Sequence, residues 1–213
     1  MPDQDATHAP QRALALAAST GGPAALEQLF QDLRKNMQDY GAEISALPPV
    51  FITQHLSAPF NALLAERLAV VSGLDCAEAF AGEKICAGRV YVAPADMHMT
   101  VQRGAGGGLR IRLMQTPPQH FCRPAADPML QSLAAAYGEN LLAVILTGMG
   151  KDGLTGCQHV AAAGGAVWVQ DATSSVVWGM PGAVVQSGLS CRVMPLQKIG
   201  AAVARWVRTG GRA

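Results

Sequence analysis

Long apolar runs and runs of like charge are both missing from this sequence, and their absence excludes several functions. No stretch approaches the roughly 18 apolar residues expected of a membrane-spanning helix. The net charge is +1 with no basic cluster, so the electrostatic footprint of a nucleic-acid or anionic-membrane binder is lacking. ALALAAS at residues 13–19 resembles a secretion signal, but it follows an acidic, proline-containing start and is too short. We therefore expect a cytoplasmic protein that is not membrane-embedded and has no nucleic-acid partner.

Cysteines are few and show no pairing pattern. The chain has five, an odd number, and no two of them form a CxxC pair, so neither a disulfide framework nor a zinc site is indicated. Cys122 lies close to His120 and Arg123 in sequence, which is the only local hint of a reactive thiol. The pattern predicts reduced, packed cysteines and no metal site at Cys76, Cys86, Cys122, Cys157 and Cys191.

Phosphate-binding loops are missing as well. The glycine-rich stretch at residues 104–108 is followed neither by a helix nor by the Lys-Ser/Thr pair of such loops, so it predicts a turn between two strands. Gly150 and Lys151 are followed by Asp152, and Ile145 stands where a Walker loop needs its first glycine. The sequence therefore predicts no nucleotide cofactor.

The composition suits one compact domain. Half of the 213 residues are hydrophobic and 15% are charged, which allows a substantial core. Short apolar strands alternate with helices, and this order predicts an α/β protein: a doubly wound, mainly parallel sheet with a β-hairpin insertion, in a single domain. We place that domain at residues 13–207, between a flexible tail or linker remnant at residues 1–12 and a second flexible tail at residues 208–213.

The elements are predicted from apolar periodicity and from turn residues. Strands are expected at residues 13–18, 49–53, 88–93, 141–147 and 166–170, with a hairpin at residues 100–103 and 109–113. Helices are expected at residues 24–33, 60–71, 129–137, 154–163 and 196–207. The remaining long segments are expected to be loops, at residues 36–48, 117–128 and 171–181, and the last is long enough to lie over a crevice.

Three of the predicted strands lead into polar residues. Ser19 follows the first strand, His55 follows the second, and Asp152 lies in the glycine-rich turn after the strand at residues 141–147. The carboxyl ends of parallel strands share one edge of an open sheet, where ligands bind. A hydroxyl, an imidazole and a carboxylate can therefore meet at this edge although they are far apart in the sequence.

Each of these residues also has a purely structural interpretation. Ser19 or Thr20 could cap the following helix, His55 could be a hydrogen-bonded histidine at a strand end, and Asp152 could cap the helix after Gly153. Together they favour acyl transfer, in which Ser19 attacks, His55 takes its proton, and Asp152 fixes the histidine tautomer. Backbone N–H groups of the glycine-rich turns would then stabilise the oxyanion.

Several longer motifs occur in order along the chain. The most specific is LTGMGKDG at Leu146–Gly153. The others are ASTGG at Ala18–Gly22, ITQH at Ile52–His55, ERL at Glu66–Leu68, APADMHM at Ala93–Met99, AGG at Ala163–Gly165 and QDATSSVVWGMP at Gln170–Pro181. With these motifs the chain resembles the catalytic domain of the chemotaxis protein-glutamate methylesterases, the CheB family, from Ala13 to about Ala204.

The resemblance implies a hydrolase that removes methyl groups from glutamate γ-methyl esters of methyl-accepting chemotaxis receptors and releases methanol; some members also deamidate receptor glutamines. By motif position it implies that Ser19 is the nucleophile, His55 the base and Asp152 its partner. It also implicates Thr20 and the backbone N–H of Met149 in support of the oxyanion. It implies no metal or organic cofactor, and its further partners are chemosensory signalling proteins.

The chain departs from the family pattern in three places. The family's QHMP becomes Gln54–Ser57, and its RPSVD becomes Arg123–Asp127. The resemblance implies a phosphorylated receiver domain before the catalytic domain, where this sequence has only residues 1–12. We expect either a fragment of a longer protein or a stand-alone esterase that is restrained in another way, and regulation by phosphorylation stays open. Two alternatives remain from the sequence: a stand-alone esterase that acts on other small esters, and a non-catalytic module that binds receptors.

Overall fold

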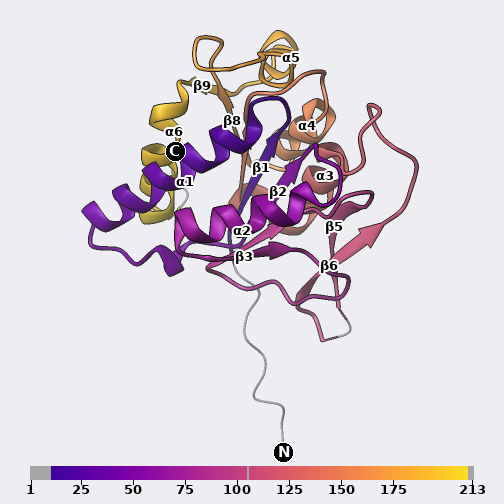
Figure 1. Ribbon diagram of the computed structural model, residues 1–213, viewed down its shortest axis with the longest axis horizontal. Coiled ribbons are helices and arrows are strands. Elements are labelled where there is room, and N and C mark those ends of the chain that lie inside the picture. Colours follow the sequence, from indigo (N-terminus) through magenta and orange to yellow (C-terminus); the bar gives the residue numbers. More distant parts are fainter. Residues whose placement is uncertain (1–10, 105, 211–213) are drawn as a thin grey trace, which may run out of the picture.

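A computed structural model describes residues 11–104 and 106–210 of the chain. A seven-stranded sheet carries helices on both of its faces, and a separate two-stranded hairpin packs beside it (Figure 1). All neighbouring strands of the large sheet run parallel, and the hairpin is antiparallel. The predicted α/β class with a mainly parallel sheet and a hairpin insertion is confirmed. Of the predicted tails at residues 1–12 and 208–213, residues 1–10 and 211–213 lie outside the described residues.

The central strand of the sheet is the first strand of the chain. In spatial order the strands are β3 (Asp75–Glu78), β4 (Arg89–Val92), β2 (Val50–Gln54), β1 (Ala13–Ala18), β7 (Leu141–Ile145), β8 (Ala166–Gln170) and β9 (Arg192–Met194). All six residues of β1 are fully buried, as expected of a strand covered on both faces. Ala18 pairs with Gln54 of β2, and Ala17 pairs with Ile145 of β7. The segments that follow β2, β1 and β7 therefore leave the sheet side by side.

The helices divide into two groups, one on each face of the sheet. Helices α1 (Gly22–Asp39), α2 (Phe60–Ser72) and α6 (Leu196–Arg208) bury their apolar residues against Leu14 and Leu16. Helices α3 (Ala126–Tyr137), α4 (Leu154–Ala162) and α5 (Met180–Gln186) pack against Ala13 and Ala15 on the other face. Alternate residues of one strand thus enter two different cores, because successive side chains of a strand point to opposite faces.

The hairpin consists of β5 (His98–Arg103) and β6 (Leu109–Met114) and lies against α3, where the Ser132 hydroxyl accepts a hydrogen bond of 3.1 Å from the N–H of Val101. Its glycine-rich connection is closed by a hydrogen bond of 2.8 Å from the N–H of Gly104 to the carbonyl of Gly108. The prediction that this stretch connects two strands of a hairpin is confirmed.

Several element boundaries differ from the predictions. Helix α1 continues to Asp39 because Met37, buried one turn after Leu33, extends the apolar stripe. Helix α3 begins at Ala126, so that Asp127 lies in its first turn and not in the loop predicted there. The short elements β3, β9 and α5 were not predicted, and two 3₁₀ turns are also present, η1 (Ile44–Ala46) and η2 (Gly138–Asn140). Within the described ranges, none of the helices combines the length and the apolar character needed to span a bilayer.

Candidate active site

Ser19 is the first residue after β1, at the centre of the carboxyl edge of the sheet. Its N–H donates to the carbonyl of Thr147 at 3.0 Å. Its carbonyl accepts hydrogen bonds from the N–H of Gly22 at 2.8 Å and from Nε2 of Gln54 at 2.9 Å. Three segments therefore fix the backbone of this half-buried serine: the segment after β7, the end of β2 and the start of α1.

His55 is the first residue after β2, beside Ser19. Its N–H donates to the carbonyl of Ala18 at 3.2 Å, which continues the pairing of the two strands to the edge. Its Nε2 lies 2.7 Å from Oδ2 of Asp152, and the side chains of His55 and Asp152 are 11% and 2% exposed. The structure thus joins two of the predicted site residues directly. Across residues 11–104 and 106–210 no hydrogen bond links the Ser19 hydroxyl to His55, and such bonds often form only once substrate is bound.

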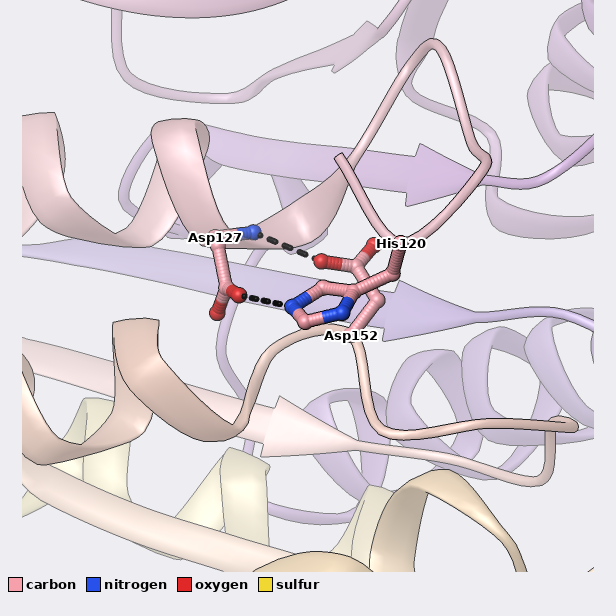
Figure 2. Close-up of side chains that lie close together, drawn as sticks. All are labelled: His120, Asp127 and Asp152. Carbon is pink, nitrogen blue, oxygen red and sulfur yellow. Dashed lines mark hydrogen bonds and ion pairs between the residues drawn. The ribbon is translucent and has the colours of Figure 1, made fainter. Parts of the chain in front are cut away.

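Asp152 is oriented by the start of helix α3. Its carboxylate accepts a hydrogen bond of 2.6 Å from the backbone N–H of Ala126. It accepts a second one of 3.1 Å from the backbone N–H of Asp127 (Figure 2). Burial alone would raise the pKa of Asp152, but the hydrogen bonds from His55 and from these two N–H groups outweigh burial and hold its pKa below the usual range. Asp152 is therefore a carboxylate, which can only accept hydrogen bonds. The Nε2 of His55 must then carry a proton and act as the donor to Asp152. The Nδ1 of His55 is left as the basic nitrogen.

Asp127 and His120 form a second layer behind Asp152. Figure 2 shows the His120 ring beside the Asp127 carboxylate, with Nε2 of His120 and Oδ2 of Asp127 3.0 Å apart. The other oxygen of Asp127 accepts a hydrogen bond of 2.6 Å from the N–H of Gly156 in α4. Burial and the nearby charge of Asp152 raise the pKa of Asp127. Asp127 therefore connects the starts of α3 and α4 to the loop that carries His120.

The same three side chains are a group of possible metal ligands. One ligand atom from each of His120, Asp127 and Asp152 lies within 4.8 Å of the others. All four carboxylate oxygens of the two aspartates already accept hydrogen bonds, from His55, His120 and backbone N–H groups. A cation at this point would have to displace those hydrogen bonds, so the contacts of this group fit a network that positions His55 better than a metal site.

Cys122 lies against the other side of the His55 ring. Its Sγ is 3.5 Å from Nδ1 of His55. Burial, together with the charge of Asp152, raises the pKa of the Cys122 thiol. A reactive cysteine needs the opposite shift, so the local hint from His120 and Arg123 does not make Cys122 a nucleophile. It contacts the base as a neutral thiol.

The turn after β7 approaches Ser19 closely. A Cβ atom added to Gly148 would lie 2.8 Å from Cβ of Ser19 and 3.0 Å from its nitrogen, so only glycine fits there. The next residue is Met149, whose side chain is 73% exposed. Among the described residues, no group accepts a hydrogen bond from the N–H of Met149 or from that of Thr20. Both N–H groups belong to segments next to Ser19 and are available to a ligand.

Three buried polar residues at strand ends support these segments and were not singled out from the sequence. Gln54 holds the carbonyl of Ser19, as described above. The Thr147 hydroxyl lies 2.9 Å from the carbonyl of Thr20 and accepts a hydrogen bond of 3.0 Å from the N–H of Val177. Gln170 accepts a hydrogen bond of 2.8 Å from the N–H of Thr147. The sequence signal that could have found Gln54, Thr147 and Gln170 is the same one that indicated Ser19: a polar residue at the end of an apolar strand.

The fold and the site together define a class of protein. A serine, a histidine and an aspartate lie at the carboxyl edge of an open parallel sheet, with unpaired N–H groups beside the serine. This arrangement is typical of α/β serine hydrolases.

Comparison with known proteins identifies the family. The sequence profile of the CheB methylesterase family matches residues 14–203, and the chain belongs to that family. The resemblance inferred from the motifs is therefore confirmed. A solved structure, the CheB methylesterase catalytic domain of Thermotoga maritima, superposes with a TM-score of 0.82 at 35% identity and covers 91% of this chain and 97% of that one.

Curated relatives carry a two-part name. The protein-glutamate methylesterase/protein-glutamine glutaminase 1 of Paramagnetospirillum magneticum is 47% identical over 94% of this chain, which covers 49% of the relative. The protein-glutamate methylesterase/protein-glutamine glutaminase of Azospirillum brasilense is 46% identical over 88% of this chain, which covers 45% of the relative. The chain thus spans about half the length of the curated relatives it matches.

Proposed function

We propose that this chain hydrolyses glutamate γ-methyl esters on methyl-accepting chemotaxis receptors and releases methanol. The observation that carries the proposal is the hydrogen bond of 2.7 Å between His55 and Asp152, at the edge where β1 ends in Ser19. The family membership and the names of the relatives point to the same reaction. The proposal includes action in the cytoplasm, as expected from the sequence, and other chemosensory signalling proteins as partners.

In the proposed mechanism the Ser19 oxygen attacks the ester carbonyl carbon while its proton passes to Nδ1 of His55. The carboxylate of Asp152 stabilises the resulting imidazolium through Nε2. The tetrahedral intermediate then expels the methoxy group, which takes the proton from His55 and leaves as methanol. Water attacks the remaining acyl-serine with the same proton transfers and releases the glutamate carboxylate and free Ser19.

The oxyanion of each intermediate needs hydrogen-bond donors next to Ser19. We assign this role to the N–H of Met149 and place Thr20 beside it, since neither N–H group has a partner among the described residues. Loss of one oxyanion donor typically costs about 10²- to 10³-fold in rate. These steps need only side chains and backbone of the chain, and the proposal includes no metal or organic cofactor.

The same site could act on amides. Attack of Ser19 on a glutamine side chain would release ammonia in place of methanol, and the relatives' names include a glutaminase activity. We propose this as a second activity of the same residues. The alternatives from the sequence, an esterase for small esters and a non-catalytic receptor-binding module, predict different outcomes of the experiments below.

The first experiment measures methanol release from methylated receptor membranes. The Ser19→Ala variant should release no methanol above the background of membranes alone, because it lacks the nucleophile. Ser190→Ala, at an exposed serine between α5 and β9, serves as the matched control and should keep the parent rate. Equal release by the parent and Ser19→Ala would remove Ser19 from its role. No release by the parent would favour the two alternatives, of which only the esterase for small esters should hydrolyse N-acetylglutamate γ-methyl ester.

A second experiment tests the base. His55→Ala should lower turnover by about 10²- to 10⁴-fold, the usual contribution of general-base catalysis. His159→Ala, at an exposed histidine of α4, should behave like the parent. A His55→Ala variant within threefold of the parent would show that another group accepts the serine proton.

A further inference from the structure

Three exposed large apolar side chains lie on segments next to Ser19 and His55. Among the described residues nine such side chains are exposed, and three of them, Phe121, Met149 and Val176, lie on segments that contact the candidate active site. Single exposed apolar residues are ordinary, but several around one site indicate a contact surface. We call Phe121, Met149 and Val176 the apolar rim.

Phe121 is held in solvent by a tight turn. The N–H of Cys122 donates to the carbonyl of Gln119 at 2.8 Å, and the N–H of Gln119 donates to the carbonyl of Cys122 at 3.0 Å. The two residues between them, His120 and Phe121, have φ angles of 49° and 64°. Left-handed backbone is uncommon for residues other than glycine, and two in succession are costly. His120 is fixed by Asp127, and Cys122 lies against His55, so the backbone of the fully exposed Phe121 is fixed next to the residue that contacts the base.

Val176 lies over the turn that follows the serine. A Cβ atom added to Gly21 would lie only 2.7 Å from Cβ and Cγ2 of Val176, which shows that Val176 covers the turn after Ser19. Its neighbour Val177 is fixed by Thr147 and by a hydrogen bond of 3.0 Å from the N–H of Gly148. The Val176 side chain is nevertheless 71% exposed. Met149 completes the rim, next to Gly148, which touches Ser19.

The proposed substrate must contact this rim. The carbonyl carbon of a glutamate γ-ester is three bonds from Cα, roughly 4 Å when extended. The backbone that carries the ester must therefore come close to Ser19, and the side chains flanking the glutamate meet whatever surrounds the serine. A free small ester makes no such contacts.

We propose that the apolar rim is the docking surface for the polypeptide that carries the esterified glutamate, and that it selects segments with apolar side chains flanking that glutamate. This inference rests on the proposed function and adds the kind of substrate that the site prefers. Burial of the exposed rim against apolar flanking residues would provide the binding free energy, as at the centre of other protein interfaces.

The test compares two substrates for the double variant Phe121→Ala/Val176→Ala. One is a methylated receptor and the other is N-acetylglutamate γ-methyl ester, which has no flanking residues. We expect the ratio of kcat/KM for the receptor to kcat/KM for the small ester to fall by about tenfold or more, mainly through KM of the receptor. In the double variant, Phe121→Leu in place of Phe121→Ala should restore part of the loss, because leucine returns apolar area without the ring.

The control is the double variant Val70→Ala/Val193→Ala, which shortens two exposed valines on α2 and on the edge strand β9. It should leave the ratio unchanged. An unchanged ratio in Phe121→Ala/Val176→Ala, or equal losses on both substrates, would contradict the proposal that the apolar rim is the docking surface. Hydrolysis of the small ester that survives Ser19→Ala would instead contradict the proposed function, so the two failures are distinguishable.

Discussion

At the scale of single residues, the candidate site depends on how Asp152 is held. Two backbone N–H groups at the start of α3 and the His55 ring surround its carboxylate. The free N–H groups at the start of a helix favour a negative charge, which explains why a carboxylate 2% exposed stays ionised. The orientation of His55 therefore depends on a helix that begins far from it in the sequence.

Asp152→Asn tests this arrangement through its pH dependence. The pKa of Asp152 is lowered from its ordinary value of 3.8, so its ionised form stabilises the fold above about pH 4, and this contribution is lost as the pH falls through the lowered pKa. The free energy of unfolding, measured with urea at pH 5, 4 and 3, should decrease more in the parent than in Asp152→Asn. Parallel decreases would contradict the assignment.

The same substitution has an expected effect on turnover. At neutral pH, Asp152→Asn should reduce methanol release by about 10⁴-fold, the loss known for this change in a Ser-His-Asp protease.

The sequence allowed prediction of the residues at the strand ends but not of their supports. Ser19, His55 and Asp152 stand out because each follows a recognisable apolar strand. The contact of Asp152 with the N–H groups of Ala126 and Asp127 depends on how α3 packs, and nothing local in the sequence indicates it. The catalytic roles of the three residues remain predictions until the variants are measured.

At the scale of elements, the turn from β1 into α1 has no spare room. A Cβ atom added to Gly22 would lie 1.9 Å from Oε1 of Gln54 and 2.8 Å from Cβ of Ala18. Gln54 is 1% exposed, so its side chain has little space to move away. The start of α1, the end of β2 and the backbone of Ser19 are thus packed as one unit.

Gly22→Ala should disturb this unit. Overpacking of this kind typically costs about 1 to 3 kcal/mol, and displacement of Gln54 would also remove its hydrogen bond to the carbonyl of Ser19. We expect a lower midpoint of thermal unfolding and reduced turnover. Gly108→Ala, where an added Cβ meets nothing within 4 Å, is the matched control. Parent-like stability and turnover in Gly22→Ala would show that the turn is more adaptable than its distances indicate.

Elements with a strong apolar pattern were predicted, and short edge elements were not. The buried strands β1, β2 and β7 are continuous apolar runs, and the helices packed on them have clear periodicity. Strand β3, with the sequence DCAE, and strand β9, with the sequence RVM, lie at the two edges of the sheet and show no alternation. The position of an edge strand is decided by its neighbour's unpaired backbone groups, which a local pattern cannot reveal.

At the scale of the whole molecule, one sheet joins two cores. Leu29 of α1 and Leu133 of α3 are both fully buried, on opposite faces. The strand order around β1 could not be read from local patterns, because neighbours in the sheet such as β1 and β7 are far apart in the sequence. The fold class was predictable from the alternation of strands and helices, whereas the pairing of distant strands was not.

Because both cores share the sheet, we expect them to unfold together. Leu29→Ala and Leu133→Ala should each lower the free energy of unfolding by about 2 to 5 kcal/mol and shift the same single transition. Circular dichroism and tryptophan fluorescence should report coincident denaturation curves. Leu63→Ala, at a side chain 51% exposed, should change stability by less than about 0.5 kcal/mol. A variant that shifts one probe alone would show that the two faces unfold separately.

The hairpin of β5 and β6 offers a practical consequence. Its glycine-rich turn lies at the opposite end of the molecule from the start of α1, and added atoms at Gly106 or Gly108 would meet nothing within 4 Å (Figure 1). A fluorophore or an affinity peptide introduced at Gly106 or Gly108 would lie away from the edge of the sheet where β1 ends in Ser19. The protein could then be immobilised or followed in a living cell with the surface around Ser19 unobstructed.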